Sequence, residues 1–300
     1  MTNRGSALLS ALFIMTLVAI ATTTLTLQLK NDIETTRLLV ETEQFRLDST
    51  LIRFWAMDYL SQEKNKAFGH TPGKTTLIKK NIALPAAPNT QFSSKLIDLN
   101  ALFNLNNLQA KAGKNTFYHL TKHVLEDESD KKSYTLTNAL AQWVGPYYPD
   151  QAQHTKQLVA HFPMVSLSEL SLVPNIPPET LEPLLPYLTV LPTPSKLNIN
   201  TASEELLMAI SLGKNAVQDM EALIEARGET GIDSLKNIRH ILKNLSINPD
   251  DVTTESEYFL NIGEIKQNKQ TRMLYSLLQR TKNKDNTYSV QLIQETWNTD

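Results

Sequence analysis

The residues best suited to metal chemistry are two histidines in the middle of the chain. His119 and His123 are four residues apart, a spacing that places two zinc ligands on one face of a helix. The zinc-peptidase motif would need a glutamate at Leu120, and a third ligand is not evident from the sequence. Two histidines without a third ligand are usually surface residues, so we predict no zinc site.

Acidic side chains offer a second metal chemistry, the binding of calcium through oxygen. They are Glu126, Asp127, Glu128 and Asp130 in one stretch, and Asp250 and Asp251 in another. Neither stretch has the spaced ligands and the sharp-turn glycine of an EF-hand, and the second indicates a turn or a helix cap. We therefore predict no cofactor. Calcium stays an open alternative, because sites outside EF-hands are not readable from sequence.

Composition excludes several kinds of catalytic site. The 300-residue chain has no cysteine, so disulfides, thiol nucleophiles and cysteine metal sites are absent. The sequence contains no nucleophile elbow, P-loop or dinucleotide fingerprint. We predict that the chain is not an enzyme. The formal net charge of -2 gives no support to a strongly basic nucleic-acid binder.

The first thirty residues contain a long uncharged segment. No charged residue occurs between Arg4 and Lys30, a length that as a helix covers the roughly 30 Å hydrocarbon core of a bilayer. Three interpretations are open. The segment is a signal peptide cut after Ala21, an anchor that stays, or the new N-terminus left when a basic leader is cut between Gly5 and Ser6.

The residues that follow favour a retained helix. After Gly5 the next glycine is Gly69 and the first proline is Pro72, so residues 6–68 lack strong helix breakers. The second half of this stretch carries an apolar residue at every seventh position, namely Leu38, Phe45, Ile52 and Tyr59. This stripe indicates either packing on the helix's own domain or a face for a partner helix. We predict one helix, half in the bilayer and half on a soluble domain.

Two segments in the middle of the chain carry helix-start signals and resemble each other. Ser166–Glu169 and Thr201–Glu204 both fit the S/T-x-x-E capping box. SELSLVPNIPPETL also aligns with EELLMAISLGKNAV at an offset of thirty-six residues. The pair predicts two small units of the SAM or helix-hairpin-helix kind.

Helix-hairpin-helix units bind DNA in many proteins, which supplies the alternative function. The hairpin of the second unit, residues 211–214, has lost one of the two glycines that offer amides to phosphate. In the first unit Pro177 and Pro178 remove those amides altogether. A membrane-anchored DNA receptor of a competence-like system is therefore the alternative, and we predict structural or protein-binding units without nucleic acid.

The remaining segments predict the fold class. Residues 64–95 indicate an irregular connection with one short strand, and residues 96–108 a strand or turn leading into a helix. Helical patterns then run to about Asn244, with an acidic loop after residue 125. Three short runs rich in tyrosine, leucine and isoleucine follow and predict an antiparallel meander. We predict an α+β fold in which a large α-helical domain is inserted into a frame of a long helix and a sheet.

The N-terminus resembles that of type IV prepilins and pseudopilins. The resemblance implies that a prepilin peptidase cleaves between Gly5 and Ser6 and methylates the amine of Ser6. Most pilins have glutamate as the fifth mature residue, where this chain has Ser10. A carboxylate in hydrocarbon needs a partner, so Ser10 points to a specialised subunit at an end of the fibre.

Five further segments, taken in order and spacing, resemble the minor pseudopilin K family of type II secretion, also called general secretion pathway protein K. They are DLNALFNLNNL at 98–108, Ser168-Glu169-Leu170, Leu191-Pro192, LNINTAS at 197–203, and Glu257-Tyr258-Phe259. The resemblance covers nearly the whole chain. One departure is clear: the family often shows Asp-Trp-x-Asp, whereas Gln142 and Gly145 replace both carboxylates here.

The resemblance implies a structural subunit with a pilin-like fold at the tip of the periplasmic pseudopilus. There it would join minor pseudopilins I and J and help to initiate assembly for protein export across the outer membrane. Charge places Arg4 in the cytoplasm and residues from about Lys30 in the periplasm, with a single pass through the bacterial inner membrane. The expected parts are a leader (1–5), a transmembrane segment (6–29), a pilin-like first part (30–108), the inserted helical domain (109–248) and a pilin-like second part (249–300).

Overall fold

The computed structural model describes residues 3–62, 76–82, 91–126, 130–145, 162–211, 217–228, 230–267 and 270–299. Contacts divide the chain into two compact units, Met1–Leu51 and Ile52–Asp300. The expected boundaries at residues 109 and 248 lie inside the second unit and stay predictions.

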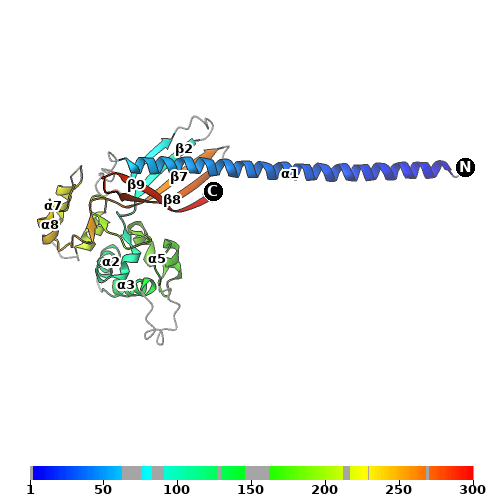
Figure 1. Ribbon diagram of the computed structural model, residues 1–300. Coiled ribbons are helices and arrows are strands. Elements are labelled where there is room, and N and C mark those ends of the chain that lie inside the picture. Colours follow the sequence, from blue (N-terminus) through cyan, green and yellow to red (C-terminus); the bar gives the residue numbers. More distant parts are fainter. Residues whose placement is uncertain are drawn as a thin grey trace. The chain divides into compact units, whose positions relative to one another are not determined.

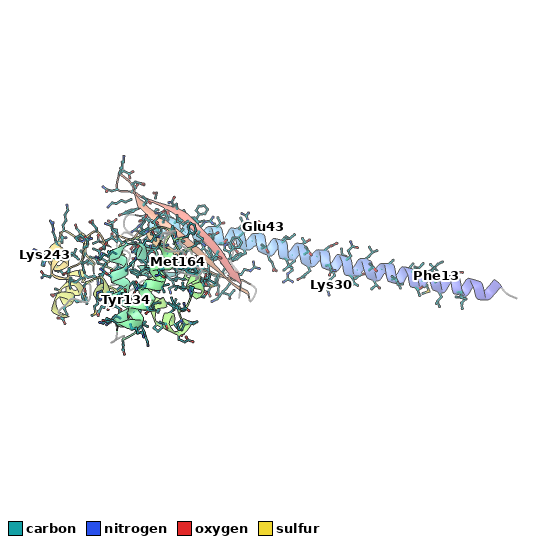
Figure 2. All side chains as sticks on the ribbon, turned by 90° about the horizontal axis from the view of Figure 1, so that it is seen from below. Phe13, Lys30, Glu43, Tyr134, Met164 and Lys243 are labelled. Atoms are coloured by element: carbon teal, nitrogen blue, oxygen red, sulfur yellow. The ribbon has the colours of Figure 1, made fainter. Side chains whose placement is uncertain are left out.

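Helix α1 (Asn3–Ser61) opens the chain and continues from the first unit into the second (Figure 1). Residues 8–29 of this helix are uncharged and exposed, and Figure 2 labels Phe13 within this segment and Lys30 just after it. Threonine hydroxyls in this segment donate to backbone carbonyls three or four residues earlier; they belong to Thr16, Thr22, Thr23, Thr24 and Thr26. These hydroxyls therefore have partners inside the helix, as a bilayer requires. The prediction of one long helix is confirmed.

A five-stranded antiparallel sheet forms in the second unit, in the order β1-β2-β7-β8-β9. The strands are β1 (Thr76–Ile82), β2 (Gln91–Asp98), β7 (Tyr258–Gln267), β8 (Gln270–Lys282) and β9 (Tyr288–Thr299). The short strand and the C-terminal meander are confirmed. Strand β2 begins inside the segment predicted as irregular, because β7, more than 150 residues later in the chain, supplies its partner.

One face of the sheet packs against the last part of α1. Alternate residues of β2 are buried, as period-two alternation requires. The core between helix and sheet comprises Ala56, Leu60, Leu96, Phe259 and Leu278. The helix also comes close to β7 at Gly263, where an added Cβ would lie 2.9 Å from Cγ2 of Ile52. Glycine at this position permits that approach.

The chain between β2 and β7 is mainly helical. Its helices are η2 (Leu105–Gln109), α2 (Lys111–Val124), α3 (Lys131–Val144), η3 (Leu167–Leu172), α5 (Pro178–Leu181), η4 (Glu182–Tyr187), α6 (Glu204–Ile210), α7 (Val217–Arg227) and α8 (Arg239–Asn244). Two short parallel pairs complete it: β3 (Phe103–Asn104) with β4 (Leu188–Thr189), and β5 (Leu197–Asn198) with β6 (Val252–Thr253). A single core with members from Phe103 to Val252 holds these elements together. The predicted α+β fold is confirmed, whereas the two-unit repeat stays a prediction.

The two predicted capping boxes have different outcomes. Ser166 and Glu169 form the reciprocal box at the start of η3. The second box is wrong, because α6 begins at Glu204 and is capped by Ser203. Thr201 is fully buried two residues before that cap, where its hydroxyl donates to Asp98. A tertiary hydrogen bond therefore takes the side chain that the local pattern assigned to the helix.

Candidate functional site

A cluster of buried polar side chains lies where the helical part leaves and rejoins the sheet. We call it the polar junction, and it consists of Asp98, Asn100, Asn198, Thr201 and Ser256. Oδ2 of Asp98 accepts from Thr201 Oγ1 and Ser256 Oγ at 2.6 Å each and from Asn198 Nδ2 at 3.2 Å. Its Oδ1 accepts from the backbone N–H of Asn100 at 2.9 Å. One carboxylate thus joins the end of β2 to β5 and to the segment before β7.

Asn100 connects the same three segments through its side-chain amide. Its Nδ2 donates to the carbonyl of Lys196 at 2.9 Å, and its Oδ1 accepts from the N–H groups of Glu257 and Tyr258 at 3.0 and 2.8 Å. Its own carbonyl accepts from Asn198 N at 2.8 Å. Buried amides of this kind substitute for a partner strand where the backbone has none.

Three asparagines of the FNLNNL segment act in the same way. Asn106 exchanges hydrogen bonds with both N–H and C=O of Met164 and also donates to Leu191 O at 2.8 Å. Asn107 exchanges two hydrogen bonds with the backbone of Ser195, and Asn104 donates to Thr193 O. The sequence analysis predicted turns from these asparagines and missed their tertiary partners. A usable signal was present, since the asparagines lie among apolar residues, and a polar side chain within an apolar segment needs a hydrogen-bond partner if the segment is buried.

The buried carboxyl of the polar junction, Asp98, and the buried guanidinium of Arg280 both have shifted pKa values. Burial raises the pKa of Asp98 above its ordinary range, and its hydrogen-bond donors offset part of that effect. Arg280 on β8 is 4 % exposed, and burial lowers the pKa of its guanidinium. Its Nη2 donates to the carbonyl of Ser256 at 3.1 Å, and its charge lies 4.9 and 4.8 Å from the ring centroids of Phe259 and Tyr288.

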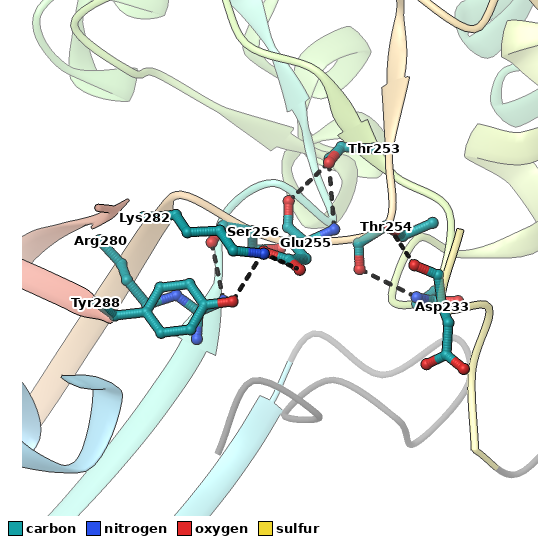
Figure 3. Close-up of polar contacts among 9 residues, drawn as sticks. Asp233, Thr253, Thr254, Glu255, Ser256, Arg280, Lys282 and Tyr288 are labelled. Atoms are coloured by element: carbon teal, nitrogen blue, oxygen red, sulfur yellow. Dashed lines mark hydrogen bonds and ion pairs between the residues drawn. The ribbon is translucent and has the colours of Figure 1, made fainter. Parts of the chain in front are cut away.

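Glu255 directly precedes Ser256 of the polar junction, and its side chain contacts the last two strands. Figure 3 shows Tyr288 and Lys282 directed at this carboxylate from the ends of β9 and β8. The Tyr288 hydroxyl donates to Oε2 at 3.1 Å, and Lys282 Nζ lies 3.4 Å from Oε1. Thr253 Oγ1 donates to the Glu255 carbonyl at 2.9 Å. The last two strands are therefore bonded to the segment through which the chain re-enters the sheet.

The apolar stripe on α1 has mixed surroundings. Leu38 is 53 % exposed, whereas Phe45 is 5 % and Ile52 0 % exposed. Tyr59 is partly buried at the helix–sheet core and stacks on Trp55 with ring centroids 5.3 Å apart. The positions in the second unit therefore belong to the core of their own domain. A role of the stripe in binding a partner helix stays a prediction.

The processing residues lie at the start of α1. Gly5 and Ser6 are helical in their backbone, and their side chains lie outside the described residues. Ser10 is exposed on the same helix. Cleavage and methylation at Gly5 and Ser6 stay predictions, as does the significance of Ser10.

The metal candidates do not form a site within the part of the chain that the structure describes. His123 is exposed on α2, and His119 is partly buried with its ring edge-on to Tyr118. No three histidine, aspartate or glutamate side chains among the described residues come close enough to share a metal ion. Asp127 and Glu128 lie outside the described residues. The absence of a cofactor therefore stays a prediction.

An open cavity of about 440 Å³ borders the asparagines beside the polar junction. Asp250 and Asp251 line it, and they belong to the predicted turn, in which Asn248 Oδ1 accepts from Asp250 N at 3.1 Å. Asn104 and Asn107 also line the cavity, but their amides are already bonded to backbone. We assign no ligand to this cavity.

Comparison with known families decides what kind of protein carries these features. Two family models, both for type II secretion system protein K, match residues 101–193 and 197–258, together just over half of the chain. The chain belongs to this family. Three residues of the polar junction, Asn198, Thr201 and Ser256, lie in the second matched segment. The resemblance recognised from the sequence is confirmed.

A solved structure supports the fold of this protein K family member. The chain is 18 % identical, with a TM-score of 0.63, to a chain in the crystal structure of the GspK-GspI-GspJ complex from the type 2 secretion system of enterotoxigenic Escherichia coli. The match covers 88 % of this chain and 99 % of that chain. At this identity the likeness shows the fold alone. No curated protein matches the chain.

The departure from the expected Asp-Trp-x-Asp pattern falls at the end of α3. Gln142 is exposed, and Trp143 is buried in the helical core. Gly145 ends the helix, and an added Cβ there would lie 2.7 Å from the carbonyl oxygen of Ala141. The backbone at this helix end is therefore suited to glycine rather than to aspartate.

Proposed function

We propose that the chain is a structural minor pseudopilin at the tip of the type II secretion pseudopilus, where it helps to initiate assembly. The observation that carries this proposal is the continuity of α1. A single helix runs from an uncharged, exposed segment into a domain of the protein K family. A fibre subunit needs such a helix, first as its membrane anchor and then as a core element.

The first half of α1 has the properties of a membrane anchor. Its 25 uncharged residues between Arg4 and Lys30 span about 37 Å as a helix, more than a hydrocarbon core of about 30 Å. Among the described residues, α1 is a helix that is both long enough and apolar enough to cross a bilayer. With Arg4 on the cytoplasmic side, the bulk of the chain lies in the periplasm of a bacterium with a single pass through the inner membrane.

Processing and partners complete the proposal. A prepilin peptidase cleaves between Gly5 and Ser6 and methylates Ser6, and Ser10 in place of glutamate suits a subunit with no subunit above it. The partners are minor pseudopilins I and J, in line with the three-protein complex whose chain this one resembles. The role is structural, and neither comparison is to an enzyme.

The intact mass and N-terminal sequence of the protein purified from membranes test this proposal first. We expect a chain that begins at methylated Ser6 and keeps the uncharged segment. Cleavage after Ala21 would contradict the proposal, because it would remove the helix that a fibre subunit requires. An uncut chain would also contradict it and would make a direct DNA-binding measurement the next step.

A further inference from the structure

The last strand, β9, forms one edge of the sheet. It has twelve residues and pairs with β8 on one side, and no other strand within the described part of the chain pairs with its outer side. The residues in the middle of β9 are exposed, including Leu292 at 36 % and Ile293 at 38 %. A row of main-chain donors and acceptors therefore faces outward beside exposed apolar side chains.

The hydrogen-bond pattern identifies which residues direct their backbone outward. Asn283 N–H donates to Thr287 O at 2.8 Å, so Thr287 faces β8 with its backbone. Arg280, which is opposite Val290, donates its N–H to Glu257 O on the β7 side. Because inward and outward residues alternate along an antiparallel strand, Val290 and Leu292 direct their N–H and C=O groups outward.

This edge lacks most of the features that keep sheet edges from pairing. Residues 286–294 contain no charge and no proline, and several are β-branched or aromatic. One irregularity of register occurs between Leu277 and Leu278, opposite Ile293, and the pairing from Tyr288 to Leu292 is regular. A regular, uncharged and exposed edge of this kind is a template for another strand.

We propose that β9 pairs with an extended, uncharged strand of a neighbouring minor pseudopilin. Outward N–H and C=O groups at every second residue are satisfied in series by an extended main chain, and an uncharged edge matches an uncharged strand. The choice of a different subunit over a second copy rests on the proposed function, since a tip has one copy of its terminal subunit.

Hydrogen exchange at single-residue resolution tests the proposal directly. The probe is the full chain in detergent, alone and with full-length pseudopilins I and J from the same system. We expect the amides of Val290 and Leu292 to exchange at least about tenfold more slowly in the complex, because each gains a main-chain acceptor. Contacts made through α1 alone would leave these two amides unchanged.

A matched pair of variants at one position provides the second test. Leu292→Pro removes the outward N–H while leaving the bonds to β8, which a proline at a sheet edge permits. Leu292→Thr removes the apolar side chain but keeps the N–H. We expect Leu292→Pro to reduce partner recovery on the order of tenfold and Leu292→Thr to change it little. Thermal unfolding of both variants establishes that they are folded.

Each outcome has a definite meaning. If the partners bind the natural chain and the two amides are not protected, strand pairing is wrong and the proposed function stands. If the partners do not bind the natural chain, both fail. If the amides are protected in the chain alone and the protection grows with concentration, the occupant is a second copy and the proposal of a neighbouring pseudopilin is overturned.

Discussion

At the scale of single residues, Asp98 accepts hydrogen bonds from all four other residues of the polar junction. It is fully buried and accepts four hydrogen bonds, three of them from side chains on other segments. Hydrogen bonds to a buried charged group are stronger than neutral ones, and leaving donors unsatisfied is costly. We therefore expect Asp98 to stabilise the attachment of the helical part to the sheet.

Replacing Asp98 with asparagine should destabilise the chain by about 3 kcal/mol. The amide has one acceptor oxygen, so its NH2 group faces a donor in either orientation. That donor is the backbone N–H of Asn100 on one side or the side-chain NH2 group of Asn198 on the other. Urea denaturation of the full chain in detergent measures the loss. Asp250→Asn, at an exposed carboxylate, is the control and should change stability little. Equal losses for both variants would contradict the role of Asp98.

The raised pKa of Asp98 gives this effect a pH dependence. Its folded-state pKa lies above the unfolded value of 3.8, so the folded state binds the proton more tightly. The resulting stabilisation is complete below pH 3.8 and is lost as the pH rises through the folded-state pKa. The stability difference between the natural chain and Asp98→Asn should therefore grow as the pH falls from neutrality. Denaturation series of both proteins between neutral and acidic pH would show it, and a difference that shrinks on acidification would refute the direction.

At the scale of elements, the contact between α1 and the sheet depends on two specific features. Gly263 on β7 lets Ile52 approach the strand. Arg53, one residue further along α1, has Nη1 at 2.9 Å from both carboxylate oxygens of Glu295 on β9. Both side chains of this ion pair are less than one fifth exposed, so solvent screens it weakly. The helix is thus held on the sheet by close packing at β7 and by an ion pair with β9.

Adding a methyl group at Gly263 should destabilise the contact between α1 and the sheet. Shortening the side chain of Ile52 should relieve that loss of stability. Gly263→Ala places a Cβ 2.9 Å from Ile52 Cγ2, and overpacking of this kind costs about 1–3 kcal/mol. In an Ile52→Ala background the same change should cost little, because Cγ2 is gone. A double-mutant cycle by urea denaturation measures the coupling, expected at about 1–2 kcal/mol. Additive losses would show that the two residues do not constrain each other.

At the scale of the whole molecule, α1 joins an uncharged segment to a domain of the protein K family. The first unit, Met1–Leu51, contains most of this helix, and the second contains the end of the helix, the sheet and the helical part. The apolar side chains of the uncharged segment, such as Leu12, Phe13 and Val18, are more than half exposed, so the described part of the chain does not remove them from water. Lipid, and later the fibre interior, covers them in the proposed function.

A charge in the middle of the uncharged segment should therefore reduce membrane insertion more than the same charge further along the helix. Val18→Lys places an ammonium near the bilayer centre, at a cost of about 2.5–3.5 kcal/mol for insertion. Val40→Lys, at a position that is also exposed on α1, is the matched control and should leave insertion unchanged. Alkaline carbonate extraction of membranes measures the fraction inserted. Equal fractions for the two variants would argue against the anchor.

Much of the fold was predictable because its determinants are local. The absence of glycine and proline from residues 6–68 predicts α1, and short runs rich in tyrosine, leucine and isoleucine at the C-terminus predict β7, β8 and β9. The segments that carry the protein K resemblance are also short and ordered along the chain. In each case neighbouring residues decide the conformation, so the sequence is enough.

The sequence by itself determined the long helix, the fold class and the family. The tertiary structure alone decided what the buried polar residues do: Thr201 bonds Asp98 instead of capping α6, and Asn106 bonds Met164, 58 residues away. It also showed that Arg280 is buried between two rings, for which a stretch of leucine and glutamine gave no signal. The physical reason is that a polar side chain removed from water takes whichever partner the fold brings near, and that partner's distance along the chain leaves no local pattern.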